Sequence, residues 1–401
     1  VVTGLTKVDK RLFTGASAKL GGDKAKLDGV PDAARALEGR AAGVSVQNVS
    51  GTFGTAPKIR VRGATSIYGS SKPLWVVDGV IQEDVVDVGA DDLSSGDATT
   101  LLSSAIAGLN ADDIESFQIL KDGSATSIYG AKAMAGVIVI TTKPISEGAI
   151  RVNYSGTLRL SMPDLSDYHL LTPEQKLQYE DLAGLYKAGG AAMATSFDNQ
   201  NSLDLIRDRV VRMVQSGTNT DWLAKPLRTG VSHSHTVSAD GGDKYVRYGL
   251  SLRYGNETGV MMQSARERLS GTFKLSYNKQ GKFFASNTLT VNRSTSQDPS
   301  YGSFSNFSKQ NPYQSPYDAN GELLAKLEHD LDNPLYEASL GSFNRAGSMD
   351  FLNTTTAQYW IDRNLRIDGD FSFTTRNNYS RSFKSPLSYT FRLSLIHISE
   401  P

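Results

Sequence analysis

The sequence predicts a small mixed α/β domain followed by antiparallel β-strands of the transmembrane-barrel type. Up to about residue 145, short apolar runs are separated by glycine turns and one helical pattern. From about residue 149, the chain changes to long stretches in which apolar and polar residues alternate strictly. The connections between these stretches are alternately short and long, which is typical of outer-membrane barrels.

The amino-acid composition excludes several classes of function. The chain has 401 residues, and 42 basic side chains balance 42 acidic ones, so no overall charge favours nucleic acid. It contains 0 cysteines, which excludes disulfides, thiol catalysis and cysteine metal sites. The longest apolar run, Ala133–Ile140, is far shorter than the roughly 18 residues of a membrane helix. Barrel strands need no such run.

The N-terminal part predicts one helix and five short strands. Apolar residues from Val30 to Leu37 recur at helical spacing, with Pro31 in the first turn and Gly39 at the end. The predicted strands, each bounded by glycine, proline or aspartate, are Gly43–Gln47, Lys58–Arg62, Leu74–Val77, Ser116–Leu120 and Gly136–Thr142.

The second part predicts strands long enough to cross a bilayer at a tilt. In Ile150–Ser161, for example, every even position except Gly156 is apolar or aromatic and every odd position is polar. A tilted spanning strand needs about 10 residues. The seven predicted strands are 149–161, 229–240, 244–255, 267–277, 282–293, 350–361 and 365–375. The second and fifth are the least regular, with His233, His235 and Asn287 on the apolar face.

The connections set the direction of the strands. Those at 240–243, 278–281 and 362–364 are tight turns, whereas 163–228, 256–267 and 294–347 are long. Barrels of this type place short turns on the periplasmic side, so the first strand is expected to run outward. A soluble antiparallel sheet with one wet face is the alternative. Because an open sheet edge is costly in hydrocarbon, we expect seven strands to belong to a larger barrel.

Four long segments resemble the SusC/RagA family of TonB-dependent outer-membrane transporters. RVRGATSIYGSSKPLWVVDGV and DDIESFQILKDGSATSIYGAKAMAGVIVITTK resemble segments of the family's plug domain. GVPDAARALEGRAAGVSVQ is similar to the opening of the plug. TNTDWLAKPLRTGVSHSHTVSADGGDKYVRYGLSLRYGNETGV resembles the family's second and third barrel strands.

The resemblance implies a plug-filled barrel of about 22 strands, of which this chain supplies the plug and about seven strands. It also implies a Gram-negative, Bacteroidetes-like outer membrane. The implied partners are TonB with ExbB/ExbD and a SusD-like surface lipoprotein. Expected divisions are 1–10 (end of the TonB-contacting segment), 11–145 (plug), 146–392 (barrel) and 393–401 (a non-native tail resembling adapter read-through). Since the chain begins with Val1, we expect a preceding segment.

Candidate coupling and locking residues follow from the resemblance. The expected TonB-coupling residues are Val1, Val2, Thr3 and Gly4. Arg60, Arg62 and Gly63 are the plug-locking candidates, with Arg62 expected to pair with carboxylates of the barrel wall. Ile59 and Val61 alternate with the two arginines, so a strand with one solvated charged face is the alternative.

Several plug residues are interpreted as turns. Asp78-Gly79 is a tight-turn signal, and Lys121-Asp122-Gly123 is interpreted in the same way. The hexapeptide ATSIYG occurs at 64–69 and 125–130 but lacks the glycine and lysine pattern of a phosphate loop. We interpret each copy, including Tyr129 and Gly130, as a turn or short helix. The alternative is that one copy faces the substrate chamber.

Substrate-binding candidates come from two loops. The acidic segment 83–97 contributes Asp84, Asp87, Asp91 and Asp92, and the last long loop contributes Tyr301, Tyr313 and Tyr317, which could stack on sugar rings. Solvated loop and ordinary loop packing are the respective alternatives. His233 and His235 have no third ligand in view, so no metal site is predicted.

The favoured function is TonB-dependent import of a nutrient, with a glycan as the favoured class. Import of a peptide or another nutrient is one alternative, and a non-transporting receptor or adhesin is another. A soluble β-rich enzyme is a third reading, but no hydrolytic triad or paired-carboxylate motif supports it. No cofactor is expected.

Overall fold

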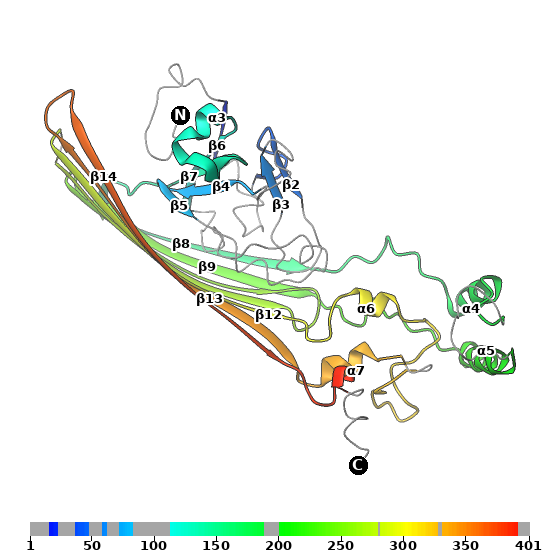
Figure 1. Ribbon diagram of the computed structural model, residues 1–401. Coiled ribbons are helices and arrows are strands. Elements are labelled where there is room, and N and C mark those ends of the chain that lie inside the picture. Colours follow the sequence, from blue (N-terminus) through cyan, green and yellow to red (C-terminus); the bar gives the residue numbers. More distant parts are fainter. Residues whose placement is uncertain are drawn as a thin grey trace, which may run out of the picture.

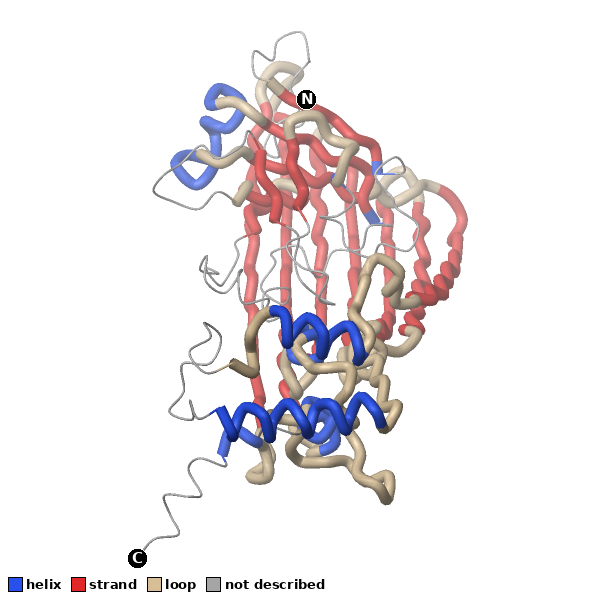
Figure 2. Tube along the Cα trace, turned by 90° about the vertical axis from the view of Figure 1, so that its right-hand side faces the viewer, coloured by secondary structure: helices blue, strands red, loops and turns tan. Residues whose placement is uncertain are grey.

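The computed structural model describes residues 16–22, 37–47, 58–61, 72–82, 113–187, 200–279, 281–327 and 331–391. A small N-terminal domain lies against the concave face of a long, curved antiparallel sheet (Figure 1). The helices of the long connections gather at the end of that sheet away from the N-terminal domain (Figure 2). The N-terminal domain therefore covers one face of the sheet, towards the short-turn end.

The N-terminal domain is built on a five-stranded mixed sheet in the order β1-β6-β7-β4-β5. Its strands are β1 (Ser17–Gly21), β4 (Leu74–Val77), β5 (Val80–Gln82), β6 (Ile114–Leu120) and β7 (Val137–Thr142). β4 and β7 pair in parallel, and the other neighbours are antiparallel. A separate ribbon joins β2 (Val44–Gln47) to β3 (Lys58–Val61). All five predicted strands are present, whereas β1 and β5 were not predicted.

Burial explains the apolar sequence of the two central strands. Phe117, Ile119, Ile138 and Ile140 are fully buried in one core cluster, together with Val61 at the end of β3. Because β6 and β7 are covered on both faces, they appear in the sequence as nearly continuous apolar runs. The predicted helix around residues 30–37 lies outside the described residues, apart from Leu37 at its end.

A short helical segment connects β6 to β7. It comprises α3 (Gly123–Thr126) and the 3₁₀ helix η4 (Ser127–Ala133). Asp122 caps α3, because its Oδ1 accepts a hydrogen bond of 2.7 Å from the Ala125 N–H. The stretch Lys121-Asp122-Gly123 was interpreted as a hairpin-type turn, and the structure shows instead that it begins a helix.

Seven strands form the long sheet, here called the wall sheet, and each pairs with its neighbour in sequence. They are β8 (Gly148–Ser161), β9 (Gly230–Gly242), β10 (Val246–Thr258), β11 (Ala265–Lys279), β12 (Phe283–Asp298), β13 (Phe343–Trp360) and β14 (Arg366–Phe383). This confirms the seven predicted strands. The sheet is not closed: β8 and β14 are its two edges among the described residues.

The wall sheet has one apolar and one polar face. The outward face exposes large apolar side chains on every strand except β12, for example Leu158, Leu252, Phe273 and Phe371. The alternate residues, mainly serine and threonine, face the N-terminal domain. This is the period-two alternation on which the prediction rested.

Within the described residues, the long connections carry four further α-helices. These are α4 (Pro173–Leu182), α5 (Gln200–Gln215), α6 (Ser305–Ser308) and α7 (Pro334–Ser339). A capping box begins α4, in which Thr172 and Gln175 exchange side-chain-to-backbone hydrogen bonds. Among the described residues, no helix is both long enough and apolar enough to cross a membrane.

Candidate functional site

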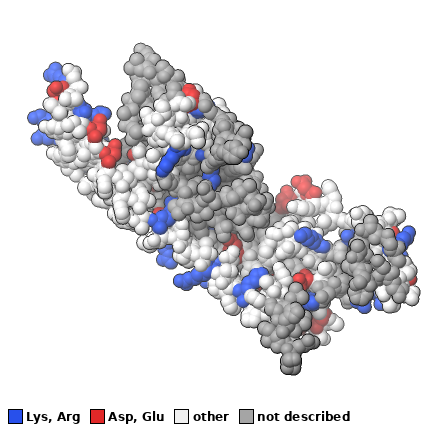
Figure 3. Space-filling model, in the orientation of Figure 1, with Lys and Arg blue, Asp and Glu red and all other residues white. Residues whose placement is uncertain are grey.

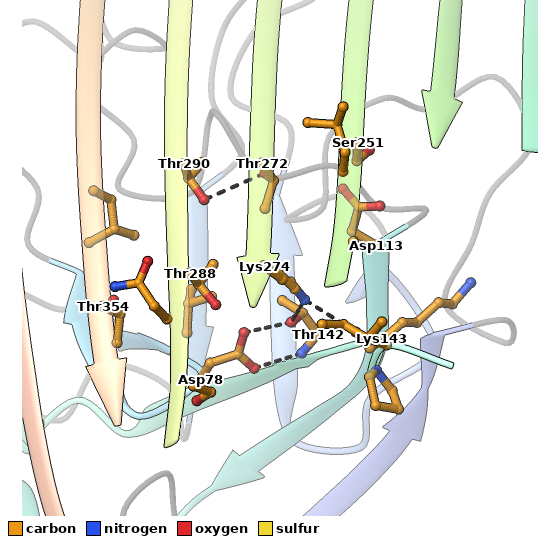
Figure 4. A pocket seen from close by; sticks show the side chains of 18 of the residues that line it. Asp78, Asp113, Thr142, Lys143, Ser251, Thr272, Lys274, Thr288, Thr290 and Thr354 are labelled. Carbon is orange, nitrogen blue, oxygen red and sulfur yellow. Dashed lines mark hydrogen bonds between the residues drawn. The ribbon is translucent and has the colours of Figure 1, made fainter. Parts of the chain in front are cut away.

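The candidate site is a cavity of about 1060 Å³ between the N-terminal domain and the inner face of the wall sheet. The N-terminal domain contributes the turn between β4 and β5, the end of β7 and the segment that leads into β8. The wall sheet contributes inward residues of all seven strands, so the cavity lies where the two parts meet (Figure 4).

Hydroxyl groups dominate the wall side of this cavity. The lining includes Thr236, Ser238, Ser251, Ser270, Thr272, Ser276, Ser286, Thr288, Thr290, Thr354, Thr356 and Thr374. They come together because they occupy the inward positions of adjacent strands in register. A hydroxyl both donates and accepts hydrogen bonds. The wall side of the cavity therefore offers many uncharged groups that can donate and accept hydrogen bonds.

Several of the charged side chains that line the cavity form ion pairs within the chain. Arg376 on β14 donates through Nε to Asp350 Oδ1 at 2.6 Å, and both side chains are largely buried. Arg151 lies 3.1 Å from Asp240. Each of these two pairs cancels much of its own field.

One basic side chain of the wall joins the two parts directly. Lys274 on β11 donates from Nζ to Thr142 Oγ1 at 2.5 Å and to the Lys143 carbonyl at 3.2 Å. Thr142 Oγ1 in turn donates to Asp78 Oδ2 at 2.6 Å, and Asp78 Oδ1 accepts from the Thr142 N–H at 2.8 Å. Figure 4 shows this chain of hydrogen bonds at the end of β7.

The turn that carries Asp78 is the predicted tight turn. Asp78 has φ 47° and Gly79 has φ 91°. Positive φ at both central residues is typical of the type I′ hairpin turn, which favours Asp-Gly. The geometry of this turn holds the Asp78 carboxylate beside Thr142, where it accepts the two hydrogen bonds from Thr142.

Replacing Lys274 by methionine is expected to loosen the contact between the N-terminal domain and the wall. Methionine keeps much of the side-chain length but donates no hydrogen bond, and charge-assisted hydrogen bonds contribute about 1.5–3 kcal/mol. Amide hydrogen exchange over residues 137–147 should accelerate about tenfold. Lys282→Met, in an exposed turn of the wall, is the control. Equal exchange in both variants would contradict a joining role for Lys274.

The predicted coupling and locking residues are mostly outside the described part of the chain. This holds for Val1, Val2, Thr3 and Gly4, and for Arg62 and Gly63. Arg60 lies on β3, and its Nε is buried without a hydrogen bond in the described part of the chain. The locking role of Arg62 stays a prediction.

The predicted substrate-binding tyrosines differ in their surroundings. Tyr301 and Tyr313 are each only 3 % exposed. Tyr301 packs edge-on against Phe307 and donates to the Met262 carbonyl at 2.7 Å, so its ring belongs to the loop core. Their burial favours the alternative of ordinary loop packing. Tyr317 is 41 % exposed, with Lys225 Nζ 5.7 Å from its ring centre.

Of the remaining candidate residues, some lie outside the described residues and others lie in the N-terminal domain. Asp84, Asp87, Asp91 and Asp92 lie outside the described residues. Tyr129 is buried in the N-terminal domain, and burial raises its pKa to about 12. Gly130, with φ 64°, turns the chain within η4. The first copy of the hexapeptide is outside the described residues, so the two copies are not compared.

The histidine pair belongs to the outward face of β9. His235 Nδ1 lies 2.7 Å from the Tyr154 hydroxyl, and its ring is tilted towards that of His233 at 5.3 Å. Within the described part of the chain, no group of three metal-ligating side chains is found.

Comparison with protein families and curated proteins identifies the N-terminal domain. The TonB-dependent receptor plug domain family matches residues 10–137. The TonB-dependent receptor SusC of Bacteroides thetaiotaomicron is 30 % identical over 331 residues, which cover 78 % of this chain and 29 % of that protein. TonB-dependent receptor P26 of Formosa agariphila is 27 % identical over 414 residues, which cover 97 % and 36 %. The chain thus spans about a third of these relatives.

Solved structures show the same fold. The RagAB peptide importer in its closed-closed state matches with a TM-score of 0.69 at 20 % identity, covering 92 % of this chain and 42 % of that chain. The ferric citrate transporter FecA without ligand gives a TM-score of 0.52 at 13 % identity, covering 92 % and 41 %. The N-terminal domain therefore has the fold of a plug, and the wall sheet that of adjacent barrel strands.

Proposed function

Because the chain belongs to the SusC/RagA family of TonB-dependent receptors, we propose that it serves in the TonB-dependent import of a nutrient across the outer membrane. The observation that carries this proposal is the seating of the plug on a polar inner wall, with a hydroxyl-lined cavity between them. In a closed barrel the plug would block this polar face, and movement of the plug would expose it.

The proposal places the chain in the outer membrane with several partners. TonB with ExbB and ExbD would supply the force on the plug, and a SusD-like lipoprotein would lie over the long-connection side. Support comes from the family and from the orientation of the sheet, whose short turns and long connections separate to opposite ends (Figure 1). Further strands would pair with β8 and β14, since an unpaired edge in hydrocarbon costs several kcal/mol per group.

An oligosaccharide is the substrate class that the cavity favours. A neutral polyhydroxylated molecule matches a lining of serine and threonine hydroxyls, each of which can donate and accept. The internally paired arginines offer little extra attraction to a charged substrate. A peptide is the second candidate, because the wall and plug resemble those of a peptide importer.

Growth of the source bacterium tests the proposal. Deleting the complete gene should abolish growth on one oligosaccharide as sole carbon source, and restoring the gene should recover it. Growth on the constituent monosaccharide, which porins admit, is the control. Growth on the oligosaccharide should also be lost when the tonB gene is deleted. Loss of growth on a peptide source alone would favour the second candidate. Substrate binding without any growth defect would favour a non-transporting receptor.

A further inference from the structure

The outward face of the wall sheet exposes apolar side chains along the strands and arginines towards its long-connection end. Along β13 the outward residues run from Tyr359 at the short-turn end to Met349; Tyr359, Phe351 and Met349 expose large apolar side chains, and this stretch is here called the apolar band. Three exposed outward arginines, here called the arginine rim, lie at its long-connection end or beyond it: Arg293 on β12 is opposite Met349, and Arg345 on β13 and Arg381 on β14 lie beyond Met349.

Two members of the arginine rim face each other directly. Arg345 and Arg381 are cross-strand partners in the β13–β14 register. Like charges at directly opposite positions destabilise a sheet. Neither guanidinium has a carboxylate within ion-pair distance among the described residues. The pair therefore concentrates positive charge that the described part of the chain does not neutralise.

Aromatic side chains hold both guanidinium groups beside the sheet. Arg345 lies over the ring of Phe343 at 5.0 Å, and Arg381 lies over the ring of Tyr379 at 5.6 Å. Arg345 Nε also donates to Gln297 Oε1 at 3.0 Å, which leaves its terminal nitrogens for another acceptor. Stacked arginines of this kind present a fixed fork of donors, and that fork matches phosphate geometry.

The height of the rim matches the headgroup layer of a membrane. Arg345 is four residues beyond Met349 along β13, or about 10 Å above the apolar band after allowing for strand tilt. Headgroups add a layer of about 5–8 Å on each side of the hydrocarbon core, and a long arginine side chain can reach back into that layer. Charges of both signs are interspersed at the short-turn end (Figure 3), and the register places the cross-strand pair of Arg345 and Arg381 at the other end of the sheet.

We propose that Arg345 and Arg381, flanked by Arg293, bind the phosphate groups of a lipid headgroup in the outer leaflet. The apolar band below the rim would contact the acyl chains of the same lipid, and this favours a phospholipid or phosphorylated glycolipid over free phosphate. The proposal rests on the outer-membrane location in the proposed function, but it does not depend on transport or on the substrate.

The test measures lipid binding to the detergent-purified receptor, expressed from its complete gene, by native mass spectrometry. The probes are a bis-phosphorylated lipid A and the same lipid after removal of both phosphates. The wild type is expected to bind the phosphorylated lipid more tightly. R345Q/R381Q should bind it about 30-fold more weakly, because each basic residue near an anionic headgroup contributes about 1 kcal/mol. R363Q, at the short-turn end of the same hairpin, should behave like the wild type.

Any of the following outcomes would overturn the proposal. These are equal affinity of the wild type for both lipids, unchanged binding by R345Q/R381Q, or an equal loss in R363Q. Displacement of the lipid by excess inorganic phosphate alone would identify a phosphate site without lipid specificity and would also contradict it. If R345Q/R381Q changed only the oligomeric state, the rim would be an interface between receptor copies. Retention of barrel structure by each variant is checked by circular dichroism, and growth on the nutrient reports on transport separately.

Discussion

Replacing Gly136 by alanine is expected to destabilise the plug by about 4 kcal/mol, the sum of a backbone and a packing effect. Gly136 has φ +95°, a conformation that residues with a Cβ rarely adopt. An added Cβ would lie 2.9 Å from Val61 Cβ and 3.3 Å from the Leu120 carbonyl oxygen. Neither neighbour can move freely, because Val61 is buried and Leu120 belongs to the central strand β6.

The hydrogen bonds of Gly136 prevent the backbone from relaxing. Its N–H donates to the Ala133 carbonyl and its carbonyl accepts from the Leu74 N–H, each at 3.0 Å. Rotating Gly136 to a negative φ would break the connection between η4, β7 and β4. Amide hydrogen exchange over residues 114–142 of the receptor measures the loss of stability.

Gly130 provides a matched control for this experiment. It also has positive φ, +64°, but an added Cβ would meet no atom within 4 Å. Gly130→Ala should therefore cost about 1–3 kcal/mol from backbone strain alone. If the two alanine variants exchanged equally fast, crowding against Val61 would have no part in the stability of the plug.

The wall strands were predictable because their alternation has a physical cause. Each residue faces either a polar interior or an apolar surrounding, so the sequence repeats with a period of two. The predicted strand 350–361 corresponds to β13, which spans Phe343–Trp360 in the structure. The first seven residues were missed because the outward positions Arg345 and Gly347 interrupt the alternation between Phe343 and Met349, although the hydrogen-bonded ladder continues there.

The helices of the long connections had local signals that were not used. In α5, Leu203, Ile206, Val210 and Met213 recur at three- and four-residue spacing, and Leu203 and Val210 are buried. The sequence TPEQ before α4 contains the capping box and the proline of a helix start. Their placement inside a segment interpreted as one long loop concealed both signals.

The contacts of the candidate site could not be predicted from local patterns. Lys274 and Thr142 are 132 residues apart, and nothing in either neighbourhood indicates the other. A lysine at an inward strand position resembles any other polar lining residue. Only the curvature of the sheet and the seating of the plug bring this lysine to the end of β7. The resemblance to a family supplied the plug and wall as units, but not the side chains that join them.

Replacing Glu180 by alanine is expected to detach α4 from the last long connection, at a local cost of about 3–5 kcal/mol. Glu180 is 3 % exposed, and its carboxylate accepts hydrogen bonds from the hydroxyls of Tyr186 at 2.6 Å and Tyr313 at 3.1 Å. Lys176 lies 3.6 Å away. Alanine would leave two buried hydroxyls without this acceptor and a gap where the carboxylate was.

Glu180→Gln removes the negative charge of the side chain but keeps its shape. Glutamine retains one acceptor oxygen at nearly the same position, so the expected cost falls to about 1–2 kcal/mol. Hydrogen exchange over residues 173–187 and 311–315 reports on both sides of the contact. Equal protection in wild type and Glu180→Ala would show that the carboxylate does not join them.

Alkaline pH should weaken the same contact, and the sign follows from the two tyrosines. Burial, reinforced by the Glu180 carboxylate, raises the pKa values of Tyr186 and Tyr313 above the ordinary value of 10.0. A group with a raised folded-state pKa contributes stability that is fully present below its unfolded pKa and is lost as the pH rises towards the folded one. Protection of α4 should thus be constant near neutral pH and fall above about pH 10. Tyr313→Phe removes one of the ionising hydroxyls, so its pH dependence should be shallower even though the variant starts from lower stability. If the protection of α4 fell equally steeply with pH in Tyr313→Phe and in the wild type, the group responsible would not be Tyr313.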